Sequence, residues 1–501
     1  MPILLLMFLL IACSPIQWPG PKWKTSIPIT LLLNGVILIL WIIFLYSISY
    51  RIRLLLIKYP ERIRSTVRKY QNWRSILSFM SMILFALMLL VSGWGWAIQN
   101  SCVLPFDTTS EMEEAILFPG GELLIILPYF MILGSSWLIF YDCEKSIVSR
   151  GEMVNQFWSR SGYFFFRFRQ FLVLVMLPVG MMIFQEGLFR IAPHLRDAWW
   201  VQLGSLLSVP ILLIFLPSFL PFVLGLRPLE TPEIRSRLET IAHRFGLSYR
   251  NFYLWPTHGS IANAMVVGII PRYRFVVFTD RLIENLNPDE IDAVLGHEIG
   301  HVRHGHLIYY ALFLLLSVLV ISSLYEFLNQ YWGLSSTENP LLEIAPIMIM
   351  GVYLFIIFGF LSRGCERQAD LYGCRANSET GHLYSSTSAA ISSSSVESLI
   401  KALLQVEELN GMRFHSAVPS RSLRQKIIYR FRSIMHWLSA WQHSTIHNRV
   451  RYLERVIVQP HEADRFQKRF FLFKLGLLLF LLGSLVGIGF TLGWKTILRL
   501  V

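Results

Sequence analysis

Eight long apolar runs constrain the fold of this 501-residue chain more than any other feature of its sequence. A helix needs about 20 apolar residues to cross the hydrocarbon core of a bilayer. Only 15% of the residues are charged, against roughly 25% in soluble domains, which excludes a disordered chain, a coiled coil and an ordinary soluble globule. The runs lie near residues 26–49, 75–98, 122–141, 171–189, 199–225, 307–328, 345–361 and 475–494. We therefore expect a mostly α-helical, multi-pass integral membrane protein with about eight transmembrane helices.

The distribution of charge between the runs predicts which loops face the cytoplasm. Residues 50–74 and 142–170 are rich in Lys and Arg, whereas residues 99–121 and 329–344 contain neither. Because Lys and Arg collect in cytoplasmic loops, topology explains the net charge of +13, which therefore does not indicate a nucleic-acid partner. We expect a protein of the plasma (inner) membrane whose larger water-facing segments lie on the cytoplasmic side.

The expected topology divides the chain into five parts. Residues 1–225 form an N-terminal transmembrane region with about five spans, and residues 475–501 form a C-terminal span. Residues 226–306 and 362–474 form the two halves of a small cytoplasmic α+β domain, and the transmembrane pair 307–361 separates them.

Capping and turn signals resolve the first half of that domain further. A cap at Thr231, followed by a proline and an acid, predicts a helix that runs to about His243 and stops at Gly246. Asn287, followed by another proline, opens a second helix. Short β-like runs lie between them at Asn251–Trp255, Ile261–Val267 and Phe275–Thr279.

Three other features of the sequence carry less information. Residues 3–12 are apolar but too short to span, so a cleaved signal, a lipoprotein box and a membrane-dipping segment all stay open. The five cysteines are few, odd in number and scattered, and they give no disulfide framework. The Ser-rich stretch 385–398 predicts a mobile loop.

The motif that carries chemistry is His297-Glu298-Ile299-Gly300-His301, within the second predicted helix. Residues four apart lie on one helical face, so both imidazoles can reach the same metal ion. Two nitrogen ligands with an open coordination position are typical of hydrolytic zinc sites, and the glutamate beside the first histidine can then act on water. We expect His297 and His301 to bind zinc and Glu298 to act as the catalytic base.

The third protein ligand is not expected to be either of the nearby histidines. His304 lies seven residues beyond His297, or about 10 Å along a continuous helix, whereas ligands of one zinc ion lie within about 4 Å of each other. His304 and His306 are better interpreted as residues at a helix end or at the membrane interface.

A better third ligand is Glu366, which follows two spans after the histidines. An out-and-back pair of spans returns the chain to the same membrane surface, so Glu366 is expected beside the first motif. Asp370 lies one helical turn further on and can accept the second N–H of a ligand histidine. Cys365 is the alternative as a soft ligand, although a lone cysteine is more typical of a packed thiol.

These residues resemble the membrane zinc metallopeptidases of the CAAX prenyl protease and HtpX type. The resemblance rests on Phe275–Val302 and on Arg363–Asp370, which carry the H-E-x-x-H and distant E-x-x-x-D motifs, and it covers about residues 230–455. It implies a small zincin-like α+β catalytic domain with one zinc ion per subunit. It also implies His297, His301 and Glu366 as zinc ligands, with Glu298 as the base and Asp370 as a residue supporting a ligand.

Two further segments resemble substrate-binding elements of the same group. Asn263-Ala264 is similar to the Asn-Ala motif of the edge strand that aligns substrate, which fits binding by strand addition. The segment from His443 to Arg449 is similar to a late His-Pro segment, although this chain lacks the proline. The resemblance implies that His443 and Arg449 help to bind the substrate carbonyl or the developing oxyanion.

Together these features predict a zinc-dependent integral membrane endopeptidase. It would hydrolyse peptide bonds of membrane-associated or unfolded proteins at the cytoplasmic membrane face, with a protein or peptide substrate and the lipid bilayer as partners. The oligomeric state is not constrained. The alternative is a non-catalytic membrane transporter or receptor with a structural metal site, for which a fourth protein ligand would be expected in place of an open position.

Overall fold

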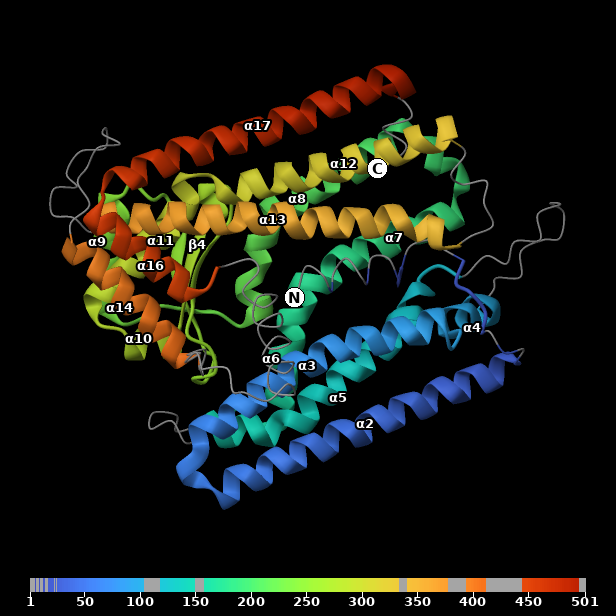
Figure 1. Ribbon diagram of the computed structural model, residues 1–501, viewed down its shortest axis with the longest axis horizontal. Coiled ribbons are helices and arrows are strands. Elements are labelled where there is room, and N and C mark those ends of the chain that lie inside the picture. The colour runs from blue at the N-terminus through green and yellow to red at the C-terminus, as the bar shows by residue number, and fades with distance from the viewer. Residues whose placement is uncertain are drawn as a thin grey trace, which may run out of the picture. The chain divides into compact units, whose positions relative to one another are not determined.

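The computed structural model describes residues 25–102, 118–148, 157–332, 340–376, 393–410 and 444–494, together with a few positions before residue 25. The described residues up to Val201 form one compact unit, and those from Gln202 onward form a second. Figure 1 shows that helices make up most of the chain, as expected. The division of the chain into five parts remains a prediction.

The first unit is built from long apolar helices. Helices α2 (Ile27–Lys58), α3 (Ile63–Leu90) and α5 (Glu122–Val148) pack against one another, and the short helix α4 (Trp94–Ser101) contacts all three. Their buried core contains Trp41 and Phe140. Helices α6 (Arg160–Phe171) and α7 (Leu177–Ile191) follow, joined by a π-helical segment, Leu172–Met176.

Six helices are long and apolar enough to cross a membrane, within the described residues. The segments are Ile27–Lys58, Ser65–Leu90, Glu122–Val148, His306–Tyr331, Ile349–Cys374 and His461–Leu492. Helix α8 (Trp199–Leu224) adds a seventh if its two halves, which are bent by 45°, count as one span. Three prolines lie inside α8, and interior prolines remove helical hydrogen bonds and bend the axis.

The count of eight spans is therefore not confirmed. The expected run 171–189 lies in α6, the π-helical segment and α7, and no spanning helix is found there among the described residues. The π-helical segment divides the run, and the 15 residues of α7 reach only about 22 Å, less than the roughly 30 Å of a hydrocarbon core.

The second unit holds a small sheet. Its strands are β1 (Arg227–Pro228), β2 (Asn251–Trp255), β3 (Ala264–Val267) and β4 (Phe275–Thr279), in the order β1-β2-β4-β3. Strands β2 and β4 are parallel, whereas β3 pairs with β4 in the antiparallel sense and forms an edge. The predicted β-like runs Asn251–Trp255 and Phe275–Thr279 are confirmed, whereas Ile261–Val267 forms a strand only from Ala264; the short strand β1 was not predicted.

Helix α11 (Pro288–Arg303) begins at the predicted cap and packs on this sheet. The Asn287 side chain and Glu290 form a reciprocal capping box at its start. Its residues Leu295 and Ile299 share one buried core with Phe252 and Phe278 of the sheet. Helices α9 (Pro232–Arg244) and α10 (Asp280–Asn285) complete this part.

The rest of the second unit consists of α12 (His306–Trp332), α13 (Pro340–Ala376), α14 (Ser393–Leu409), α16 (Ile446–Val458) and α17 (His461–Leu492). Helix α13 continues unbroken past the expected end of its span at residue 361, so Glu366 and Asp370 lie on the spanning helix itself. The predicted mobile loop 385–398 is wrong at its end, because α14 begins at Ser393; residues 385–392 lie outside the described residues.

Helices α11 and α13 approach each other closely through glycine. A Cβ atom added to Gly373 would lie 2.9 Å from the backbone nitrogen of His297, and one added to Gly300 would lie 2.9 Å from Cα of Ala369. Such distances are shorter than van der Waals contact, so only glycine allows this spacing. The close approach sets the two metal-ligand motifs of the sequence side by side.

We expect Gly373→Ala to force α11 and α13 apart, because its methyl group meets backbone and not a movable side chain. Overpacking of this kind lowers the free energy of unfolding by about 1–3 kcal/mol. The measurement is the midpoint of thermal unfolding in detergent. Gly483→Ala in α17 is the control, because no atom lies within 4 Å of its added Cβ; equal midpoints for the two variants would contradict the prediction.

Candidate metal centre

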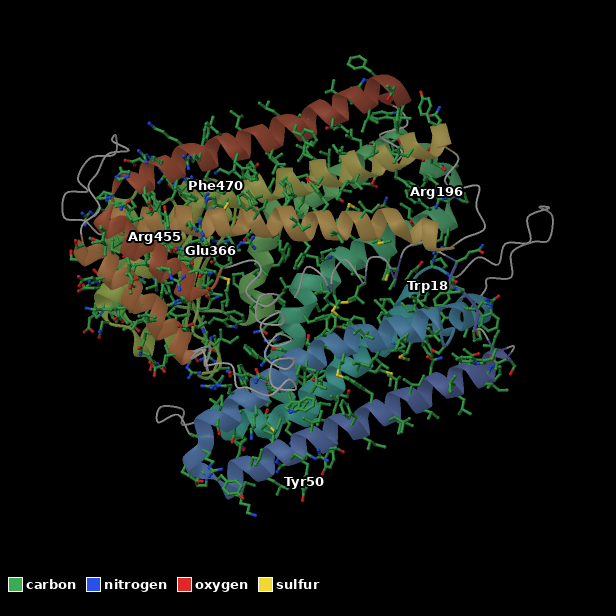
Figure 2. The ribbon with its side chains drawn as sticks, in the orientation of Figure 1. Trp18, Tyr50, Arg196, Glu366, Arg455 and Phe470 are labelled. Atoms are coloured by element: carbon green, nitrogen blue, oxygen red, sulfur yellow. The ribbon has the colours of Figure 1, made fainter. Side chains whose placement is uncertain are left out.

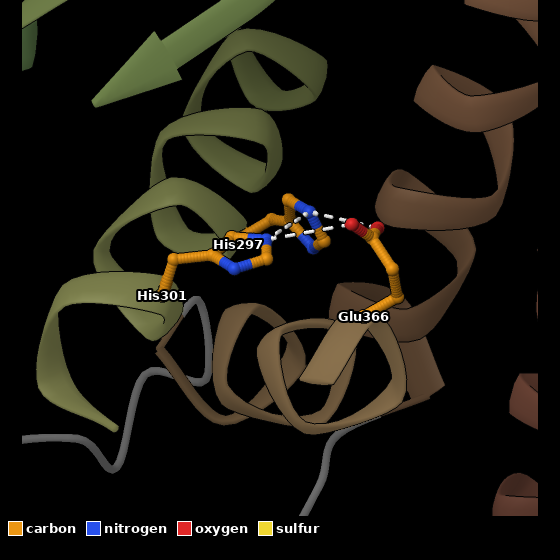
Figure 3. Close-up of side chains that lie close together, drawn as sticks. All are labelled: His297, His301 and Glu366. Carbon is orange, nitrogen blue, oxygen red and sulfur yellow. Dashed lines mark hydrogen bonds and ion pairs between the residues drawn. The ribbon is translucent and has the colours of Figure 1, made fainter. Parts of the chain in front are cut away.

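Three predicted ligands lie together between α11 and α13. His297 and His301 point from α11 toward Glu366 of α13, as Figure 3 shows. The two Nε2 atoms are 3.2 Å apart, and the Glu366 carboxylate oxygens lie 3.7 Å from Nε2 of His297 and 3.9 Å from Nε2 of His301. Ligands about 2.1 Å from one ion in tetrahedral geometry are separated by roughly 3 to 4 Å, so this donor set fits a single metal ion.

Asp370 fixes the orientation of the first ligand histidine. Its Oδ1 lies 2.9 Å from Nδ1 of His297, and the carboxylate is fully buried. Burial opposes protonation of His297, but the hydrogen bond to Asp370 and the nearby carboxylates outweigh it and raise the pKa of His297. Nδ1 donates to Asp370, so Nε2 is the nitrogen that faces the other candidate ligands. A metal ion at the cluster would bind the lone pair of Nε2 in place of the proton that this atom carries in the imidazolium form.

Arg449 of α16 holds both carboxylates of α13. Its guanidinium donates from Nε to Oδ2 of Asp370 at 2.9 Å, and Nη1 lies 3.2 Å from Oε2 of Glu366. The side chain is buried; burial disfavours its charge, but Asp370 and Glu366 outweigh this effect and raise the pKa of Arg449. The structure thus places this predicted substrate-binding residue against the carboxylate of Glu366, the candidate third ligand.

Glu298 lies between the metal ligands and the edge strand. Its Oε2 accepts a hydrogen bond from the backbone N–H of Val266 at 3.1 Å. Desolvation by burial is the largest influence on this carboxyl group and raises its pKa to about 7. A carboxylate with such a pKa can both accept and return a proton near neutral pH.

The predicted substrate-binding pair lies at the start of β3. Asn263 is exposed, and its backbone bonds to Thr279 of β4. Ala264 and Val266 then fall at the alternate positions whose backbone N–H and C=O groups point away from β4. Among the described residues no strand pairs with this edge of β3, and the edge runs past Glu298.

The sequence analysis interpreted one residue near this centre, His306, only as a helix-end or interface residue, and it missed a second, Asn410. His306 is buried, and its Nδ1 lies 2.9 Å from Nδ1 of His301; it supports that ligand and is not a member of the ligand cluster. Asn410, at the end of α14, exchanges two hydrogen bonds with the backbone of Ala262, just before the edge strand. Neither residue stands in a motif, so no local signal identified them.

The remaining candidates do not join the cluster. Cys365 is buried and is not one of the three grouped ligands, and His304 forms the C-terminal cap of α11. His443 lies outside the described residues.

Comparison with known proteins identifies the group to which this segment is related. Residues 228–432 match the model of Peptidase family M48. CAAX prenyl protease 1 of Saccharomyces cerevisiae is 28% identical over 198 residues, which cover 34% of this chain and 42% of that protein. A protease HtpX homolog of Moorella thermoacetica is 26% identical over 250 residues, 47% of this chain and 75% of that protein. A second HtpX homolog, from Methanocaldococcus jannaschii, is 24% identical over 158 residues, 30% of this chain and 54% of that protein.

The fold is also similar to a solved structure, the crystal structure of S. mikatae Ste24p. The TM-score is 0.50 at 18% sequence identity, and the match covers 86% of this chain and 100% of that one. The chain spans about half the length of the first curated relatives it matches. The resemblance to CAAX prenyl protease and HtpX is thus confirmed, and the apolar helices and these relatives support a multi-pass integral membrane protein.

We expect the purified protein to bind one divalent metal ion per chain, and Glu366→Ala to weaken this binding on the order of 100-fold or more, because one of three protein ligands is lost. Competition with a chelator in detergent measures the affinity. Glu454→Ala, which removes an exposed glutamate of α16, is the matched control and should bind as the wild type does. Unchanged affinity in Glu366→Ala would show that the carboxylate is not a ligand.

Proposed function

We propose that this chain is a zinc-dependent integral membrane endopeptidase that hydrolyses peptide bonds of membrane-associated or unfolded proteins. The observation that carries the proposal is the placement of Glu298 beside the cluster of His297, His301 and Glu366. Two histidines and one glutamate are a donor set that catalytic zinc sites use, and an adjacent carboxylate can act as the base. The match to Peptidase family M48 over the same residues supports it independently.

The metal and the base divide the work of hydrolysis. One zinc ion per chain, held by His297, His301 and Glu366, would polarise the scissile carbonyl and lower the pKa of water. Glu298 takes one proton from the water molecule as its oxygen bonds to the carbonyl carbon. It then delivers that proton to the amide nitrogen as the carbon–nitrogen bond breaks, so that the carboxylate is regenerated.

The edge strand β3 aligns the substrate. An extended peptide can pair with the outward backbone groups of Ala264 and with the C=O of Val266, as in other cases of strand addition. The N–H of Val266 already donates to Glu298, so a peptide lying along this edge passes directly beside the catalytic base. The exposed side chain of Asn263 is then available to bond to the substrate backbone.

Arg449 supports the site through its carboxylates. Its contacts with Asp370 and Glu366 assign it a positioning role. The further role of Arg449 and His443 in binding the substrate carbonyl or the oxyanion follows from the resemblance alone and stays a prediction.

We place the active site at the cytoplasmic face of the plasma membrane, because the loops rich in Lys and Arg lie on that side of the proposed topology, in which residues 171–225 cross the membrane an even number of times. A structural metal in a transporter or receptor is disfavoured. The cluster of described residues contains three protein ligands, which leaves a coordination position open, whereas a structural zinc site is closed by a fourth.

We expect Glu298→Gln to retain zinc and to lower the rate of cleavage about 10²- to 10⁴-fold, the usual contribution of a positioned base. Cleavage of an unfolded reporter protein in detergent measures the rate, and bound metal is measured on the same samples. Glu454→Gln on the exposed face of α16 is the control and should cleave at the wild-type rate. If Glu298→Gln cleaves at that rate too, Glu298 is not the base.

We expect Asn263→Ala to raise KM about tenfold with a smaller effect on kcat, because one hydrogen bond to a bound peptide, worth about 1 kcal/mol or more, is lost. Steady-state kinetics with the same reporter separate the two constants. Since the Asn263 side chain is exposed, the thermal midpoint should not change. An unaltered KM would remove Asn263 from the substrate site.

A further inference from the structure

A chain of hydrogen bonds connects the second ligand histidine to the C-terminal helix α17. Nδ1 of His301 lies 2.9 Å from Nδ1 of His306, and Nε2 of His306 lies 3.1 Å from Oε1 of Gln368. The ammonium group of Lys474 donates to the same Oε1 at 3.2 Å. We call these four residues the His301–Lys474 chain; its last three members are buried.

Chemistry sets the direction of every bond in this chain. An ammonium group can only donate, so Gln368 must present its oxygen to Lys474 and not its NH₂ group. The same oxygen faces Nε2 of His306, which must therefore carry a proton and donate it. A neutral imidazole with its proton on Nε2 offers a lone pair on Nδ1.

The directions of these bonds determine which nitrogen of His301 can bind a metal ion. Because Nδ1 of His306 accepts, Nδ1 of His301 must donate, and its proton occupies that nitrogen. Nε2 of His301 then carries the free lone pair, and this is the atom that faces Nε2 of His297 and Glu366. Nδ1 of each ligand histidine thus donates to a neighbouring side chain: Asp370 for His297 and His306 for His301.

Helix α17 holds Lys474 in place. The hydroxyl of Tyr309 in α12 donates to the backbone oxygen of Lys474 at 2.7 Å. The ammonium group also lies 5.6 Å from the centre of the Tyr309 ring and 5.3 Å from that of Phe470, within the range of cation–π attraction. Figure 2 shows Phe470 on α17 and Glu366 on α13. A buried lysine with these partners is held from several directions.

We propose that His306, Gln368 and Lys474 are positioning residues that fix the tautomer and the orientation of the metal ligand His301, and that α17 acts on the metal centre through them. The inference rests on the proposed metal-binding function. It assigns a role to the last apolar helix of the chain beyond crossing the membrane.

The first test compares two substitutions of the same residue. His306→Leu removes the acceptor for His301, whereas His306→Asn keeps an acceptor, because its Oδ1 lies close to the position of Nδ1. Zinc affinity is measured in detergent by competition with a chelator on the full-length protein. Loss of a residue that supports a metal ligand costs about 10- to 100-fold in affinity, and we expect this for His306→Leu. His306→Asn should weaken zinc binding by no more than about tenfold, because the bond to His301 is retained and only the bond to Gln368 is lost.

The second test acts at the other end of the chain. Lys474→Met keeps the length of the side chain but removes the donor that orients Gln368. We expect zinc affinity to fall about tenfold, the lower end of the same range, because two hydrogen bonds separate Lys474 from the ligand. Lys468→Met, at an exposed position of the same helix, should bind zinc as the wild type does.

The thermal midpoint of the metal-free protein, measured in excess chelator, shows whether each variant folds. If His306→Leu does not fold, the comparison of Lys474→Met with Lys468→Met decides the question. Wild-type affinity in folded His306→Leu or Lys474→Met overturns the inference, as does equal weakening by His306→Asn and His306→Leu. A wild-type protein that binds no zinc overturns the proposed function together with this inference. Unexpected affinities in the variants of His306 and Lys474 overturn only the inference and leave the proposed function intact.

Discussion

The close approach of α11 and α13 is the contact on which the rest of the site depends. The backbone of α13 at Gly373 touches that of α11 at His297, and Gly300 touches α13 at Ala369. Helices with larger residues at these positions would lie further apart, at the usual separation of 8–10 Å. The imidazoles of one helix and the carboxylates of the other can therefore meet without long side chains. These side chains have little conformational freedom, so assembling the site costs little side-chain entropy.

Charge balance favours a cation at this contact. Glu366 and Asp370 are buried carboxylates, and Arg449 is the buried guanidinium that contacts both. A buried charge is costly unless it is paired, and one guanidinium cannot neutralise two carboxylates. A divalent ion at the cluster would supply the missing positive charge. Asp370 would interact with that ion indirectly, through its hydrogen bond to Nδ1 of His297. Hence the fold leaves negative charge at this site that a divalent ion, or a proton on His297, would balance.

The sequence predicted those parts of the fold and site that depend on local pattern. Apolar length identified most of the spans, and the motif spacing together with the out-and-back topology brought Glu366 to the histidines. Contacts between distant segments were not visible. The bond of His306 to His301 depends on how α12 leaves α11, and that of Lys474 to Gln368 depends on how α17 packs on α13. The sequence analysis also did not predict the break in the run 171–189, because a π-helical turn leaves the hydropathy of the residues unchanged.

The unbroken length of α13 ties the site to the bilayer. The segment Ile349–Cys374 is one continuous helix that contains Glu366 and Asp370, whereas the two histidines belong to α11, which is not a candidate spanning helix. Helix tilt responds to the thickness of the surrounding lipid. A thinner or thicker membrane would therefore shift both carboxylates as a unit relative to the imidazoles, so lipid composition becomes a variable of the coordination geometry.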